Sequence, residues 1–116
     1  MSLLTKQQIL AAHDHVTEDV EVKEWGGTVR VSTMSAADRD KWEDETLVDG
    51  ATNKDNFRAR FVARCLVDEN GCRLFTPEDI AELGAKSGAA LARVHSVAWR
   101  LNGFGAAATE EAEKKS

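Results

Sequence analysis

The chain has 116 residues, a formal net charge of −5 and a pI near 5.2, and this length is typical of a single domain. The 20 acidic residues outnumber the 15 basic ones, so no cationic excess is left to neutralise phosphates, and we expect no nucleic-acid partner and no membrane partner. The apolar runs are far shorter than a membrane span, and the N-terminal stretch lacks the form of a signal peptide. We therefore expect the protein to stay in the cytoplasm of the cell that makes it.

Two capping patterns predict helices in the first half of the chain. A capping box that opens at Thr5 predicts a short helix that fades near His13. A second pattern, at Ser35, predicts a helix that runs to about Thr46. Trp42 is its only large apolar residue, so we expect a peripheral helix with one anchor and its acidic side chains in solvent.

A strand pattern lies between these two helices. Valines alternate with polar residues over 20–22 and again over 29–31, on either side of Gly26-Gly27. This pattern predicts a β-hairpin at about residues 19–33, with both glycines in a tight turn and the valine face docked on helices. The charged residues of the opposite face, which we expect in solvent, are Glu21, Lys23 and Arg30.

A third helix is predicted from about residue 54 to 67. Its core stripe repeats every four residues and consists of Phe57, Phe61 and Cys65. Arg60 and Arg64 fall on the opposite side of this helix. Before this helix, Asp49-Gly50 indicates a turn within a linking segment.

The second half continues with a turn at residues 68–71, a short extended return and two further helices. Thr76 followed by Pro77 is a strong helix start, and an apolar face predicts a last helix from about residue 85 to 102. We expect a mainly α (α+β) fold, a small helical domain over residues 1–105 with one N-terminal hairpin, more than about 50% helix and a mobile tail at 106–116.

The sequence contains no recognisable catalytic or metal-binding pattern. The spacings of Cys65 with Cys72 and of His13 with His15 match no zinc motif, and we expect two reduced thiols, one of them buried. The glycine of the 68–71 turn arrives too early for a calcium loop. His95 flanks the apolar face of the last helix, where a half-buried histidine is expected. We therefore expect no enzyme activity and no cofactor.

Two tryptophans lie off the predicted core and are the candidate partner-binding residues. Trp99 lies on the side of the last helix opposite its apolar face, so it either packs in a second layer or anchors a protein contact. Trp25, at the hairpin tip, either folds back over the valine face or serves as such an anchor.

Several motifs together resemble the tail assembly chaperones of phages and prophages with long, non-contractile tails (siphoviruses). The motifs are Glu24-Trp25-Gly26-Gly27-Thr28-Val29-Arg30-Val31, Ser35-Ala36-Ala37-Asp38-Arg39-Asp40, Leu66-Val67-Asp68-Glu69-Asn70-Gly71, Leu74-Phe75-Thr76 and the sequence Ala-Trp-Arg-Leu-Asn-Gly at 98–103. Each motif alone is weak, but their order and spacing cover about residues 18 to 105. The first 17 residues and the tail carry none of the resemblance.

This resemblance implies a chaperone without catalytic residues. Its partner would be the tape measure protein, kept soluble in the host bacterial cytoplasm until the tube protein polymerises around it. The resemblance also implies recruitment of tail tube subunits, self-association and absence from the finished virion. The alternatives are a structural tail or head-completion component retained in the virion, a regulatory adaptor unrelated to phage, and a small enzyme.

The C-terminal residues carry one further hypothesis. Members of this family are often made in a longer form by ribosomal frameshifting near the end of the gene. Lys114-Lys115 can be encoded by a run of adenines, which is a slippery template, although lysine-rich tails are also common without one.

Overall fold

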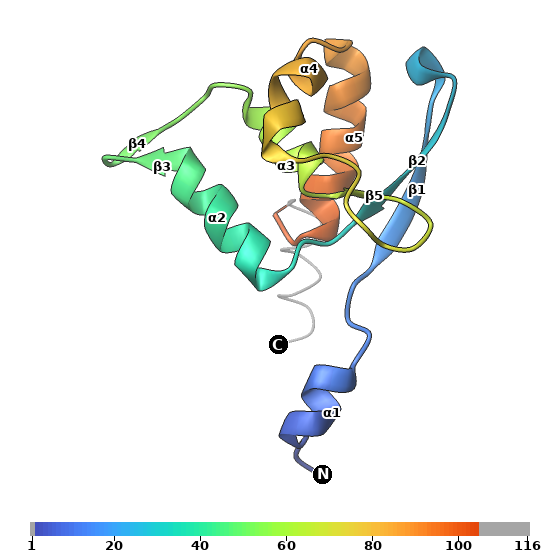
Figure 1. Ribbon diagram of the computed structural model, residues 1–116, viewed down its shortest axis with the longest axis vertical. Helices are drawn as coiled ribbons and strands as arrows, with labels where there is room; N and C mark the ends of the chain where they lie inside the picture. Colours follow the sequence, from blue (N-terminus) through green and yellow to red (C-terminus); the bar gives the residue numbers. More distant parts are fainter. Residues whose placement is uncertain (1, 105–116) are drawn as a thin grey trace.

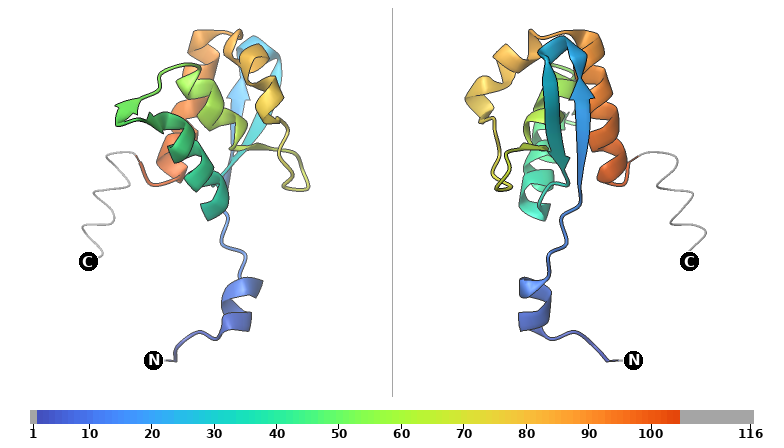
Figure 2. Two further views of the ribbon diagram at one scale, coloured as in Figure 1. Left: turned by 60° about the vertical axis from the view of Figure 1, so that its left-hand side comes forward. Right: turned by 90° about the vertical axis from the view of Figure 1, so that its right-hand side faces the viewer.

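The computed structural model describes residues 2–104, which form five α-helices, a three-stranded antiparallel sheet and a separate two-stranded one (Figure 1). It is 48% helical and 18% strand, which confirms an α+β mixture with somewhat less helix than predicted. In the three-stranded sheet, β2 (Gly27–Ser32) lies between β1 (Thr17–Val22) and β5 (Leu66–Val67). Helix α5 (Gly88–Leu101) packs against β1 and β2 and, on its other side, against α3 (Phe57–Ala63) (Figure 2).

The predicted hairpin is present. Strand β1 (Thr17–Val22) pairs with β2 (Gly27–Ser32), with Val20 opposite Val29. The turn differs from the prediction, because a 3-10 turn, η1 (Lys23–Trp25), fills most of it and only Gly26 has a positive φ, 74°. Gly27 is already the first strand residue. A longer connection of this kind aims the hairpin tip, including Trp25, toward the helices.

The first two predicted helices are confirmed. Helix α1 (Lys6–Ala11) has the reciprocal capping box of Thr5, and α2 (Ala36–Thr46) begins after Ser35, whose hydroxyl accepts a hydrogen bond from the Asp38 N–H at 3.1 Å. The link after α2 is more ordered than predicted. It is a two-stranded hairpin of β3 (Leu47–Val48) and β4 (Ala51–Thr52).

The turn of this small hairpin explains why it forms. Asp49 and Gly50 have φ values of 52° and 79°, so both central residues are left-handed, as a primed hairpin turn requires. The Asp-Gly pair is a strong hairpin signal, and the sequence prediction treated it only as a turn.

The third predicted helix was too long. Helix α3 ends at Ala63 (Phe57–Ala63), and Leu66 and Val67 form strand β5, in which Leu66 pairs with Val31 of β2. Helical periodicity continues through these residues, but pairing with an existing hairpin edge satisfies their backbone groups and buries both side chains. Strands are therefore not confined to the N-terminal hairpin.

Arg60 and Arg64, which lie opposite the core stripe of α3, are buried as well. Their exposed fractions are only 7% and 6%. Helix α2 and the link that follows it cover this side of α3, so α3 is enclosed on both sides. The sequence did not predict this second layer, because a helix face that contains arginines usually lies in solvent.

The C-terminal half follows the prediction with one shifted boundary. A 3-10 turn, η2 (Pro77–Asp79), has the predicted capping box and leads into α4 (Ile80–Gly84). Helix α5 (Gly88–Leu101) begins three residues later than predicted, because Ser87 supplies its N-cap. The predicted core positions Ala90, Leu91, Val94 and Ala98 are buried. The predicted tail at 106–116, and with it Lys114-Lys115, lies outside the described residues.

Candidate functional site

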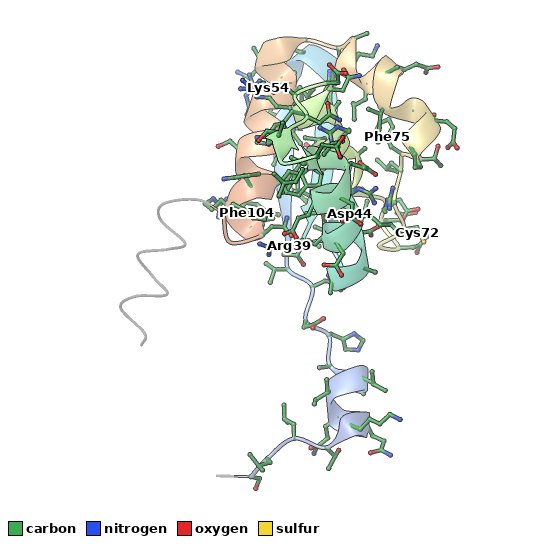
Figure 3. The ribbon with its side chains drawn as sticks, turned by 90° about the vertical axis from the view of Figure 1, so that its left-hand side faces the viewer. Arg39, Asp44, Lys54, Cys72, Phe75 and Phe104 are labelled. Carbon is green, nitrogen blue, oxygen red and sulfur yellow. The ribbon has the colours of Figure 1, made fainter. Side chains whose placement is uncertain are left out.

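Exposed apolar side chains gather at the N-terminus. We call residues 3–14 the N-terminal arm; it contains α1, all of whose residues are exposed. Eight large hydrophobic residues are strongly exposed within residues 2–104, and four of them belong to the arm: Leu3 (88%), Leu4 (69%), Ile9 (57%) and Leu10 (74%). In Figures 1 and 3 the arm stands clear of the body of the molecule. An exposed apolar concentration of this kind is typical of a protein contact.

The arm is fixed to the body at a defined point. The main-chain N–H of Val16 donates to the hydroxyl of Thr33 at 3.2 Å, and the N–H of Thr33 donates to the carbonyl of Val16 at 3.0 Å. The His15 ring nitrogen Nδ1 lies 3.0 Å from the same Thr33 hydroxyl. The arm therefore extends from an anchored base at the start of β1.

Trp25 lines a cavity of about 420 Å³ near the hairpin tip. The cavity is formed by the hairpin turn, the loop before η2, and α4 with the short segment that follows it. Its lining residues are Glu24, Trp25, Phe75, Glu82, Leu83 and Lys86. The volume lies within the range of cavities that hold ligands. Trp25 also packs on the core, and its buried indole Nε1 has no hydrogen-bond partner among the described residues.

The hairpin tip carries a short ion pair beside this cavity. Both Glu24 carboxylate oxygens accept hydrogen bonds from the Arg93 guanidinium of α5, at 2.8 and 3.0 Å. These bonds lower the pKa of Glu24 to about 2. Glu24 thus forms its ion pair with Arg93. The other carboxylate that lines the cavity, Glu82, has no ion-pair partner within the described residues.

Trp99 lies in an aromatic cluster between α2, α3 and α5. Its ring stacks on Phe104 with centroids 4.4 Å apart and lies 5.1 Å from Phe61 and 6.0 Å from Trp42. The Arg39 guanidinium covers the Phe104 ring at 4.1 Å, and Figure 3 shows these two side chains together. Trp99 is half-buried, so it packs in a second layer, and a role of its remaining exposed part in partner binding stays a prediction.

His95 joins the same cluster, stacked on Trp99 at 5.4 Å, and is half-buried as predicted. Burial, with a smaller contribution from the nearby Arg58, lowers the pKa of its imidazole. A neutral aromatic ring suits this packing position.

An ion-pair network joins α2 to α3, and sequence reasoning missed it. Arg64 binds Asp38 at 3.0 Å and also Glu45, Arg73 reaches Asp38 at 2.9 Å, and Arg60 lies 3.8 Å from Glu45. Asp38 and Glu45, predicted in solvent, keep only 23% and 36% side-chain exposure. The signal that could have found them is their spacing from Trp42, which places all three on one helical face.

Neither thiol forms a metal site or a disulfide. Cys65 is buried and Cys72 exposed, and both are free, as predicted. Burial raises the pKa of the Cys65 thiol to about 12, which leaves it unreactive. Over residues 2–104 no group of three potential metal ligands comes together, and no helix in that part of the chain is long and apolar enough to cross a membrane.

These features define a small α+β protein whose most prominent surface feature is the group of exposed apolar side chains on the N-terminal arm. The sequence matches the family model of the phage tail assembly chaperones over residues 5–115, so the chain belongs to this family. The match includes most of the arm, which carried none of the sequence resemblance described above.

A solved structure supports the same fold. The tail assembly chaperone of bacteriophage HK97 is similar to this chain with a TM-score of 0.60 and 17% sequence identity, over 82% of this chain and 90% of that one. At this identity the likeness concerns the fold alone. No curated protein sequence shows significant similarity to the chain.

Proposed function

We propose that this protein binds apolar segments of the tape measure protein in the host bacterial cytoplasm and keeps them soluble until the tail tube assembles. The observation that carries the proposal is the N-terminal arm, with Leu3, Leu4, Ile9 and Leu10 exposed and packed on nothing in the body. A short amphipathic helix of this kind can cover an apolar helix of a client.

The proposal includes the later fate of the chaperone. It leaves the tail as the tube closes around the tape measure protein, so it is absent from the virion. Tail tube protein is a second proposed partner, because a chaperone that releases its client to the tube must work close to it. A net charge of −5 favours protein partners over DNA during assembly.

Co-expression with the tape measure protein tests client binding. We expect the native chain to keep the tape measure protein in the soluble fraction and to copurify with it. The arm variant Ile9→Asp/Leu10→Asp should lose both effects, because charges on this face prevent apolar contact. The proposal is wrong if the arm variant solubilises the client as well as the native chain does.

A matched control comes from the small β3–β4 hairpin, which lies apart from the N-terminal arm. Leu47 and Val48 on β3 are exposed to a similar degree, 63% and 48%. Leu47→Asp/Val48→Asp introduces the same charges without touching the N-terminal arm and should preserve client binding.

Mass spectrometry of purified virions tests the departure of the chaperone. Absence of its peptides from particles that contain the tape measure protein supports a chaperone. Their presence in stoichiometric amounts would favour a structural tail or head-completion component instead.

A further inference from the structure

We propose that a cationic groove between the starts of α3 and α5 binds an acidic peptide segment of a partner protein, in which carboxylates flank one apolar side chain. This contact does not depend on the proposed function, because the groove and the N-terminal arm are separate surfaces. Lys54 lines the groove, and in Figure 3 it lies at the end of the body that is remote from the arm.

The groove forms where the starts of two helices meet the end of a third. Its lining comes from the link before α3, the first residues of α3 and α5, and the end of α4 with the segment that follows it. A Cβ on Gly84 would clash with the side chain of Asn56, so this glycine lets the end of α4 approach the start of α3. The approach brings Lys86 into the same groove as Lys54 and Arg58.

Three exposed cations, Lys54, Arg58 and Lys86, line the groove, and no acidic residue lines it. Within residues 2–104 every arginine except Arg58 forms an ion pair, and neither lysine of the groove forms one. After burial, the charge of Arg58 is the second cause that lowers the pKa of His95, as expected of a guanidinium without an anionic partner. Three unpaired cations thus share one groove in a chain whose net charge is −5.

The acidic residues nearest in sequence offset this positive charge only in part. Asp55 follows Lys54 directly but does not line the groove. Glu82 lies one helical turn before Lys86 and lines the cavity at the hairpin tip together with it, so it offsets part of the charge of Lys86. We therefore expect Lys54 and Arg58 to make the main contacts with an acidic partner.

The floor of the groove is apolar, since Ala59 and Leu91 are buried there and Phe57 is half-buried. The volume of about 270 Å³ lies below the range of small-molecule sites, so the groove suits single side chains of a peptide. Cations around an apolar floor complement carboxylates on either side of an apolar residue. A nucleic acid would not use this floor, and three cations offer few phosphate contacts against the net negative charge.

Fluorescence anisotropy with a fluorescein-labelled peptide, Glu-Glu-Leu-Glu-Glu, tests this assignment on the full chain. We expect the native chain to bind the peptide, and Lys54→Glu/Arg58→Glu to bind it about tenfold more weakly, because each reversal replaces an attraction by a repulsion. Both positions are exposed and lie at the start of α3, where acidic side chains are favourable, so the variant should fold. A native chain that does not bind the peptide, or binds the neutral Gln-Gln-Leu-Gln-Gln equally well, would overturn the proposal.

The matched control is Lys23→Glu/Lys41→Glu, which has the same net charge as the groove variant. Both lysines are exposed and lie outside the groove. At an ionic strength of about 0.1 M, charges farther than about 10 Å from the peptide are largely screened, so the control should keep its affinity to within about threefold. Equal losses in the two variants, or no loss in the groove variant, would contradict a defined site.

Chemical-shift mapping by NMR on the native chain locates the peptide without any substitution. Addition of unlabelled Glu-Glu-Leu-Glu-Glu should shift most strongly the backbone amides that line the groove, including those of Phe57, Gly84 and Gly88. The amides of the N-terminal arm should hardly move. Shifts centred on the arm or on the hairpin tip would place the peptide elsewhere and overturn the proposal.

Two other occupants would give different results. Glu110, Glu111 and Glu113 lie outside the described residues, and replacing all three by glutamine should leave the peptide affinity unchanged. A gain of about tenfold would show that the chain's own carboxylates compete for the groove, and the partner assignment would be wrong. An oligothymidylate of five nucleotides that binds as tightly as the peptide would assign the groove to phosphates instead.

Discussion

Helices α2 and α5 pack on the same core by different chemistries. Helix α5 buries Ala90, Leu91, Val94 and Ala98, a face of small and aliphatic side chains at helical spacing. Helix α2 buries only Trp42 and Thr46, and it places Asp38 and Glu45 on the buried Arg64. One helix is held by apolar packing along its length, and the other by one aromatic anchor between two ion pairs.

The difference shows what hydrophobic periodicity can detect. Periodicity finds a helix that docks through apolar side chains, because they cluster on one face. Hydrophobic periodicity does not by itself find the inward face of a helix that docks through carboxylates, because those residues look the same as solvent-exposed ones, and in α2 only their spacing from Trp42 points to that face. The buried partner, Arg64, is hidden for the same reason.

Replacing the anchor of α2 should have the largest effect. Trp42 lies 5.0 Å from Phe61 and 5.8 Å from Phe57, ring centroid to centroid, in edge-on geometry. Trp42→Ala leaves a cavity in this cluster, and we expect it to lower the free energy of unfolding by about 3–5 kcal/mol. Urea unfolding followed by circular dichroism measures this loss.

The control for this change lies on the same helix. Asp44 is exposed, so Asp44→Ala should leave stability nearly unchanged. A loss for Trp42→Ala that is no larger than this control would mean that the anchor contributes little.

Removing the buried guanidinium should have the next largest effect. Removing one partner of a buried ion pair costs about 3–5 kcal/mol, but Asp38 and Glu45 keep 23% and 36% exposure and can regain water. We therefore expect Arg64→Met to lower the free energy of unfolding by about 2 kcal/mol. Arg100→Met, which breaks an exposed pair with Glu18, is the matched control and should cost much less.

The opposite result for Arg64→Met would also be informative. A variant as stable as the native chain would show that burying the guanidinium costs as much as its ion pairs contribute. Helix α2 would then be held by Trp42 alone.

Much of the fold could be predicted from local sequence signals. The caps at Thr5, Ser35 and Thr76 and the valine alternation of the hairpin fix their elements through neighbouring residues alone. Strand β5 could not be predicted in this way, because Leu66 and Val67 become a strand only through pairing with β2, which is distant in sequence.

The motifs that resemble the family mostly build the fold. Asn102 accepts a hydrogen bond from the Met34 N–H at 2.8 Å and so joins the end of α5 to the start of α2. Asp68 bonds two backbone N–H groups of its own turn. Such residues identify the family and its fold, but they carry no information on the partner surface. The arm, which carries the proposed contacts, has no motif because apolar exposure depends on what the body leaves uncovered.

The two cysteines should differ strongly in reactivity, and the difference reports how α2 and α5 close the core. Cys65 is buried against Asn102, with a pKa raised to about 12, whereas Cys72 is exposed. At pH 8 we expect Cys65 in a Cys72→Ser chain to react with iodoacetamide over about a hundredfold more slowly than Cys72 in a Cys65→Ser chain.

Loosening α2 by the Trp42→Ala substitution should expose Cys65. If α2 closes the core, Trp42→Ala in the Cys72→Ser background should accelerate the alkylation of Cys65, and Asp44→Ala should not. Equal rates in all three chains would show that Cys65 is reached by a route that does not involve α2.

The smallest expected effect concerns the hairpin tip, which is joined to α5 by an exposed ion pair. Arg93 holds the pKa of Glu24 near 2, below its ordinary value of 4.5. Because the folded pKa is the lower one, the pair stabilises the protein fully above about pH 4.5, and this contribution is lost as the pH falls from there toward 2. Arg93→Ala should therefore flatten the decline in unfolding free energy between pH 4.5 and 2, whereas Lys41→Ala should leave this decline unchanged.

The Glu24 carboxyl can also be titrated directly by NMR. In the Arg93→Ala variant the pKa of Glu24 should rise toward its ordinary value. An unchanged titration would mean that the tip is not held by this pair, and that packing of Trp25 alone positions the cavity beside it.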